Sequence, residues 1–132
     1  MIAILATISL VIVVIAGLWI AAIGVGMTTM PDRMRRGLAM MASTQRINVT
    51  ELSLRIVVGI AMIGRANAAK FPDFFAYGGW FLIVSAIILL VIPLRWHSGY
   101  AVWWSAKLGL WAIRLLGPVA IAMGCALIWA AI

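Results

Sequence analysis

The sequence predicts an all-α integral membrane protein with four transmembrane helices and a cytoplasmic amphipathic interfacial helix. Of the 132 residues, 67% are hydrophobic and 10% are charged, and the mean hydropathy is +1.20, so charges are too few to coat a water-soluble globule. The apolar residues gather in runs of about 20, the length a helix needs to cross a bilayer core. These runs are continuous and lack the short alternating segments that are typical of barrel strands.

One domain with four spans and two interfacial segments is expected. The spans cover about 2–26, 52–69, 74–92 and 110–131, and the interfacial segments cover about 31–46 and 94–107. The first span lacks charge and the basic start of a signal peptide, so we interpret it as a retained helix. The second is the weakest span, because Arg55 and Arg65 bracket its apolar centre. It crosses a thinned or tilted path if both arginines snorkel to opposite interfaces, and it is otherwise a re-entrant or surface segment.

The segment after the first span predicts a surface helix and then a new helix start. Pro31 and Asp32 are typical of a first helical turn. Apolar residues then recur at steps of three and four, at Met30, Met34, Leu38 and Met41. A basic amphipathic helix in the membrane surface is expected. Further on, Asn48 followed by Glu51 resembles a capping box, which predicts that the next helix begins near Val49.

Basic and aromatic residues in both interfacial segments predict contact with lipid headgroups. These residues are Arg33, Arg35, Arg36, Arg46, Trp96, Trp103, Trp104 and Lys107. Tryptophan is enriched at membrane interfaces, and anionic headgroups attract cations near the surface. We therefore expect anionic lipids, and no nucleic acid, as partners of the positive charge, and we expect bound lipid.

The distribution of basic residues predicts the topology. With four spans, one side collects eight of the ten Lys and Arg residues, and the other receives only Arg65 and Lys70. Short cytoplasmic loops are enriched in Lys and Arg. This predicts a multi-pass protein of the bacterial cell inner membrane with both termini on the non-cytoplasmic side.

No group of side chains in the sequence predicts catalysis. The acids Asp32, Glu51 and Asp73 fall at predicted interfaces, with Asp73 on the opposite side, and there is one histidine and one cysteine. We expect no enzyme, no metal site and no obligatory cofactor. An alternative is a pigment- or haem-binding protein that uses His97, because neutral imidazole is a common ligand and aromatic residues surround it.

Three arginines within or beside spans support a second alternative, a small oligomeric transporter or channel. Arg55, Arg65 and Arg114 are candidates, because an ionisable group inside a membrane is a functional candidate by default. Each arginine lies within reach of an interface, where its charge needs no transport role.

Small residues at helical spacing predict close helix packing. They are Gly17 and Ala21 in the first span, and Ala120, Ala122, Gly124, Ala126 and Ala130 in the last. Such residues let another helix approach closely. The pattern does not say whether the neighbouring helix belongs to the same chain.

The stretch from Arg55 to Arg95 resembles the small four-helix DoxX-type membrane proteins. The resemblance rests on the order Leu-Arg-Ile-Val-Val-Gly-Ile, then Lys-Phe-Pro, then a glycine-rich entry into an apolar helix. It implies a four-helix membrane fold and transfers no site residue. The long uncharged first helix and the basic loop after it depart from that family.

These observations together predict a non-catalytic accessory subunit of a larger inner-membrane assembly, with respiratory and photosynthetic complexes as candidates. It would act by helix packing and by anchoring in the lipid interface. The expected partners are a larger membrane-protein complex or further copies of this chain.

Overall fold

The computed structural model describes residues 1–40 and 43–132, and the secondary structure in these ranges is helical. Its elements are α1 (Ile2–Thr29), α2 (Pro31–Met40), α3 (Gln45–Arg65), the 3-10 helix η1 (Ala66–Ala68), α4 (Pro72–Val91), α5 (Leu94–Lys107) and α6 (Leu110–Ala131). Within these ranges α1, α3 with η1, α4 and α6 are long and apolar enough to cross a membrane. The predicted all-α class with four candidate transmembrane helices is confirmed, and membrane insertion stays a prediction.

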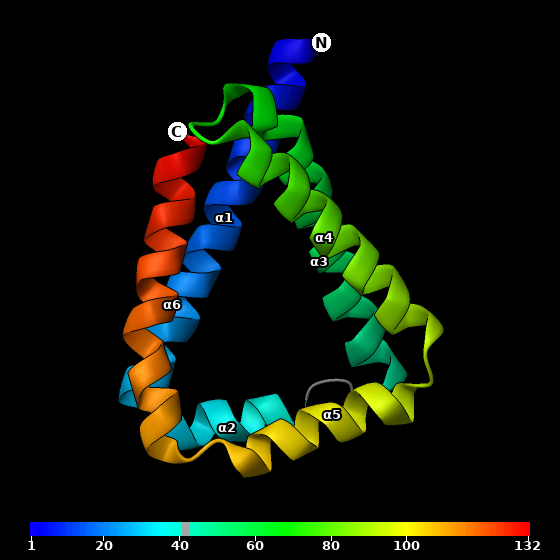
Figure 1. The fold of residues 1–132 in the computed structure, drawn as a ribbon, viewed down its shortest axis with the longest axis vertical. Helices are drawn as coiled ribbons and strands as arrows, with labels where there is room; N and C mark the ends of the chain where they lie inside the picture. Colours follow the sequence, from blue (N-terminus) through cyan, green and yellow to red (C-terminus); the bar gives the residue numbers. More distant parts are fainter. Residues whose placement is uncertain (41–42) are drawn as a thin grey trace.

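The helices form a triangular frame (Figure 1). One side is the antiparallel pair of α1 and α6, the first and last helices, and another is the antiparallel pair of α3 and α4. We call each of these two pairs a hairpin, although α1 and α6 are not consecutive in the chain. The third side, which we call the base, consists of α2 and α5, which pack against each other. The two hairpins meet opposite the base, at the apex, and both termini lie toward that end (Figure 1).

Glycines hold each hairpin together. A Cβ built on Gly24 of α1 would lie 2.6 Å from the carbonyl oxygen of Gly117 of α6, and Gly17 faces Gly124 in the same way. In the other hairpin, a Cβ on Gly59 would lie 2.7 Å from the carbonyl oxygen of Gly79. Side chains at these positions would push the backbones apart, so the small residues permit the close approach.

The predicted start of α3 is wrong. The helix begins at Gln45, and its N-cap is Thr44, whose hydroxyl oxygen accepts a hydrogen bond from the N–H of Ile47 at 3.2 Å. Thr44 satisfies one of the first helical donors, and Asn48 lies inside the helix, where it is 2% exposed. The predicted start of the surface helix at Pro31 agrees with α2, whereas Met41 of its apolar stripe lies outside the described residues.

The apex joins the two hairpins through the last carbonyls of α6. Nε of Arg65 donates to the carbonyl oxygen of Ala131 at 2.8 Å, and the backbone N–H of Lys70 donates to that of Ala130 at 2.9 Å. Nζ of Lys70 donates to the carbonyl oxygen of Trp129 at 2.9 Å. These donors satisfy carbonyls that have no partner within the helix. The buried apolar cluster, which lies between the hairpins, consists of Val13, Ala61, Met62, Ala66, Phe75, Ala130 and Ala131.

Candidate functional site

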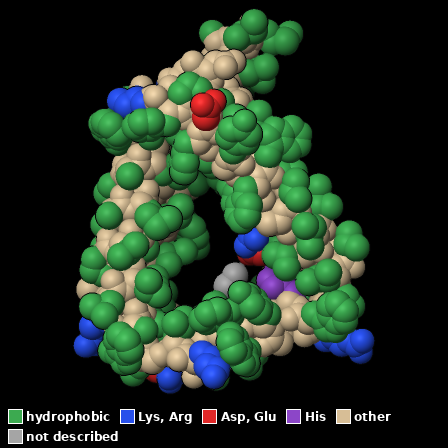
Figure 2. Space-filling view, in the orientation of Figure 1, with side chains coloured by type: hydrophobic (Ala, Val, Ile, Leu, Met, Phe, Trp, Pro, Cys, Tyr) green, Lys and Arg blue, Asp and Glu red, His purple; other side chains and the backbone are tan. Residues whose placement is uncertain are grey.

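The two hairpins enclose an apolar groove on the inner side of the frame. Its volume is about 820 Å³, and helices α1, α3, α4 and α6 all contribute to its lining. Representative lining residues are Val58 and Met62 of α3, Phe81 and Leu82 of α4, and Met123 and Ala126 of α6. Figure 2 shows an opening through the frame that is bordered mostly by hydrophobic side chains. The groove therefore offers a surface for an apolar guest.

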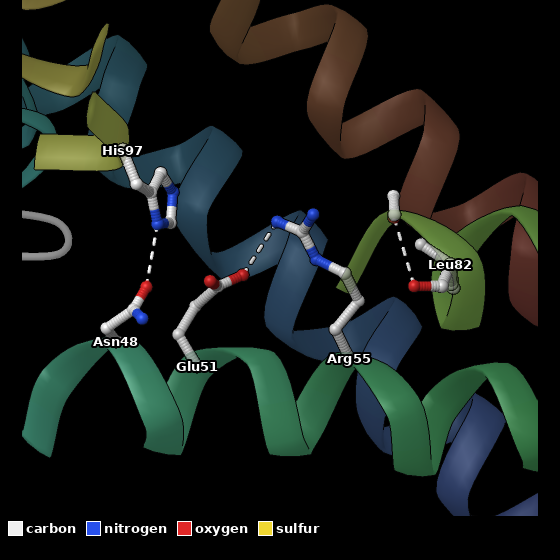
Figure 3. A network of polar contacts seen from close by, with 6 residues as sticks. Asn48, Glu51, Arg55, Leu82 and His97 are labelled. Atoms are coloured by element: carbon white, nitrogen blue, oxygen red, sulfur yellow. Dashed lines mark hydrogen bonds and ion pairs between the residues drawn. The ribbon is translucent and has the colours of Figure 1, made fainter. Parts of the chain in front are cut away.

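A polar group lies at the base end of this opening. Nδ1 of His97, on α5, and Oδ1 of Asn48, on α3, are 2.7 Å apart, and the two residues are 7% and 2% exposed. One turn further along α3, Nη2 of Arg55 donates to Oε1 of Glu51 at 2.7 Å (Figure 3). Figure 2 shows the histidine at the rim of the opening, next to an acid and a basic side chain. We call Asn48, Glu51, Arg55 and His97 the polar cluster.

One face of α3 connects the polar cluster to the groove. Asn48, Glu51 and Arg55 follow one another at steps of three and four, so they share a helix face. Val58 and Met62 continue the same spacing and line the groove. This face of α3 is therefore polar toward the base and apolar toward the apex, a pattern suited to an amphiphile.

The ion pair of the polar cluster is only partly shielded. The side chains of Arg55 and Glu51 are 28% and 29% exposed. Within residues 1–40 and 43–132, Oε2 of Glu51 is buried and has no hydrogen-bond partner. Asn48 and Glu51 were predicted to form a capping box, and the face that they share with Arg55 was not predicted. Their spacing could have indicated it.

The three candidate arginines lie apart. Arg55 belongs to the polar cluster, Arg65 binds a carbonyl of α6 at the apex, and Arg114 is exposed on α6. Since α3 rises 1.5 Å per residue, Arg55 and Arg65 are separated by about 15 Å along its axis. The geometry brings no two of these guanidinium groups to one site.

The residues expected at lipid headgroups lie on or next to the base. Arg33, Arg36, Arg46, Trp96, Trp103, Trp104 and Lys107 are exposed, and Arg35 is half-buried. Arg35 and Arg36 pair with Asp32 at 3.3 and 3.1 Å. Nζ of Lys107 lies 5.4 Å from the ring centre of Trp103, in a cation–π contact. Their contact with headgroups stays a prediction.

The residues expected at helix contacts fall into three environments. Gly17, Ala21 and Gly124 meet where α1 packs on α6. Ala126 and Ala130 line the groove, and Ala130 also belongs to the buried cluster. Ala120 is half-buried and Ala122 is exposed. The contacts of Gly24 with Gly117 and of Gly59 with Gly79 were not predicted from the sequence.

His97 serves as a contact between α3 and α5. One ring nitrogen of this imidazole bonds Asn48, and His97 is not among the residues that line the groove. Within the described residues, no group of three or more His, Cys, Asp or Glu side chains could hold a metal ion. Cys125 is exposed on α6, in the last two turns of that helix. A pigment or haem ligand role for His97 stays untested.

Comparisons with protein-family models, curated proteins and solved structures find no match to this chain. The resemblance to DoxX-type proteins therefore receives no support from them.

Proposed function

We propose that this protein is a non-catalytic accessory subunit of a larger membrane assembly, and that its frame holds a hydrophobic guest between the two hairpins. The observation that carries the proposal is the apolar groove of about 820 Å³ on the inner side of the frame. An apolar space of this size at membrane depth is filled by lipid or protein, because water gains no hydrogen bonds there. The frame thus depends on a molecule other than its own chain.

The tight packing within each hairpin supports a rigid holder. Glycine contacts fix α1 to α6 and α3 to α4, and hydrogen bonds at the apex fix the hairpins to each other. The base holds the far ends apart, since α2 and α5 run between them (Figure 1). A guest can then occupy the groove without a large rearrangement of the helices.

We further propose in which membrane the protein lies and which side of the membrane its base faces. The segments that carry Arg33, Arg46 and Arg95 lie at the base, and Arg65 and Lys70 lie at the apex. Under the positive-inside rule the base faces the cytoplasm of a bacterial inner membrane, and both termini face the other side. In this orientation α2 and α5 lie in the cytoplasmic interface, where they anchor the subunit.

A native gel tests the accessory role. Membranes that contain the tagged chain at its native level are solubilised in a mild detergent, separated by size, and searched for proteins that co-migrate with the 14.3 kDa chain. We expect co-migration with a larger complex, which a respiratory or photosynthetic activity stain would then identify. Migration of the chain alone, or only with copies of itself, contradicts the accessory role.

A second candidate function is anion transport. The position of the Arg55 guanidinium, at the rim of the opening, supports it. Purified protein in vesicles loaded with an anion-sensitive dye tests this candidate. Anion flux that is lost in the Arg55→Gln variant, while assembly is intact, favours transport. Wild-type vesicles as tight as empty vesicles favour the accessory role.

A further inference from the structure

We propose that the opening binds one anionic phospholipid, whose acyl chains occupy the groove and whose phosphodiester is hydrogen-bonded to Arg55. This inference rests on the proposed function, because it names the hydrophobic guest. Three features support this lipid: the apolar groove, the guanidinium toward the base from it, and the excess of positive charge on the base side of the frame.

The groove has the chemistry that acyl chains require, and the face of α3 that runs from the polar cluster to the groove has the length. Its lining is almost entirely apolar, and side chains such as Met62, Met123 and Phe81 border it. Methionine adapts its shape to flexible apolar partners. From Glu51 to Met62, α3 rises about 16 Å, close to the roughly 15 Å of half a bilayer hydrocarbon core. A lipid with its headgroup at Glu51 would thus place its chain ends near the apex.

Arg55 can bind a phosphate at the base end of the groove. Its side chain reaches back by one turn to Glu51, so the guanidinium lies on the base side of its own Cα (Figure 3). A guanidinium carries five N–H donors, and within the described residues only one hydrogen-bond partner, Glu51, engages them. Because the side chain is 28% exposed, further donors are accessible to a phosphodiester, which arginine binds in a bidentate manner.

The charge of the base favours an anionic headgroup over a zwitterionic one. Eight basic residues belong to the base side of the frame, against the acids Asp32 and Glu51. Positive charge of this kind attracts anionic lipids to the interface. The carboxylate of Glu51 repels the negatively charged phosphate, and its ion pair with Arg55 occupies one donor of the guanidinium. Removal of each partner of this pair should therefore have opposite effects on the lipid.

Native mass spectrometry of the full chain in a mild detergent tests the headgroup. Equal amounts of phosphatidylglycerol and phosphatidylcholine with the same acyl chains are added, and the lipid that remains bound is identified. We expect one retained phosphatidylglycerol, preferred about tenfold, because the basic residues of the base repel the choline cation of phosphatidylcholine, whereas both lipids carry the phosphodiester that Arg55 binds. Arg55→Gln should weaken the retention of both lipids, because it removes the donor to their common phosphodiester, and Glu51→Gln should keep or raise that retention. Equal loss in both variants would mean that the ion pair is only structural, and would overturn the proposal.

Two alanines of α6 test the groove. Ala126 lines it, whereas Ala122, one turn earlier, is exposed outside it. Ala126→Phe should fill the groove and remove both lipids at least tenfold, and Ala122→Phe should retain them. The double variant Glu51→Gln/Arg55→Gln, which leaves no unpaired charge, should fold and retain less of both lipids than the wild type. Retention of lipid by Ala126→Phe overturns the proposal.

The same variants separate this inference from the proposed function. A polypeptide that co-purifies with the wild type and is displaced by Ala126→Phe, without any bound lipid, would refute the phospholipid and leave the accessory role intact. A chain that binds neither lipid nor polypeptide would refute both.

Discussion

The contact of Asn48 with His97 is the buried side-chain hydrogen bond that links the base to α3. Both residues are almost fully buried, and their polar atoms lie 2.7 Å apart. In a site of low dielectric constant, a buried polar group that loses its partner costs more than the bond itself contributes. The pair should therefore fix the angle between α5 and α3, which sets the width of the opening.

Single and double substitutions of this pair should show strong coupling. Asn48→Ala or His97→Ala should each lower the free energy of unfolding by about 1–3 kcal/mol, because each leaves a buried partner unsatisfied. The double variant should lose less than the sum of the two. Unfolding in mixed micelles of mild detergent and dodecyl sulfate measures all four free energies. Additive losses would show that the two side chains do not interact.

Substitution of His97 also distinguishes a structural role of this residue from its alternative role as a ligand of a pigment or haem. In our account the imidazole acts through Asn48, so the His97→Ala variant should keep the visible absorption spectrum of the purified wild type. A visible band that is present in the wild type and missing from His97→Ala would establish the cofactor role instead.

At the scale of elements, the hairpins depend on backbone contact at glycines. A Cβ on Gly124 would collide with the carbonyl oxygen of Gly17 and lie 2.8 Å from the backbone nitrogen of Ala21. Backbone atoms cannot move aside as a flexible side chain can, so α1 and α6 would have to separate. Gly99 of α5 offers a control, because a Cβ there would have no neighbour within 4 Å among the described residues.

Gly124→Ala and Gly99→Ala should therefore change stability in opposite directions. Overpacking of the α1–α6 contact should cost about 1–3 kcal/mol. Gly99→Ala should stabilise the protein by about 0.5–1 kcal/mol, because alanine loses less conformational freedom in a helix. Thermal unfolding in detergent, followed by circular dichroism, measures both changes. A stable Gly124→Ala variant would contradict the close packing of the hairpin.

The frame as a whole predicts which segments face the same side of the membrane. In a Cys125→Ser background, single cysteines at Arg46 and Ser98 should react with an impermeant maleimide from one side. A cysteine at Lys70 should react from the other side, together with one at the C-terminus. Labelling at Lys70 from the same side as Arg46 would refute the four-span topology.

The sequence predicted the parts of the frame that depend on local signals. Long apolar runs identified the four long helices, and Pro31 marked the start of α2. The start of α3 was missed because Thr44, four residues before Asn48, caps the helix instead. The bond of Asn48 to His97 was missed because it depends on a partner 49 positions away in the chain. The pairing of Gly24 with Gly117 and the groove were missed for the same reason. The glycine pairing arises only when α1 packs against α6, and the groove arises only when the two hairpins meet.

Photo-crosslinking from the groove tests most directly whether the frame holds a guest. Benzoylphenylalanine replaces Met123, which lines the groove, or Val119, which is similarly exposed one turn earlier on α6 and lies outside it. After purification in detergent has removed bulk lipid, the protein is irradiated and its mass is measured. We predict one defined adduct at Met123 and none at Val119. The absence of an adduct at Met123, or the same adduct at both positions, would contradict a guest held between the hairpins.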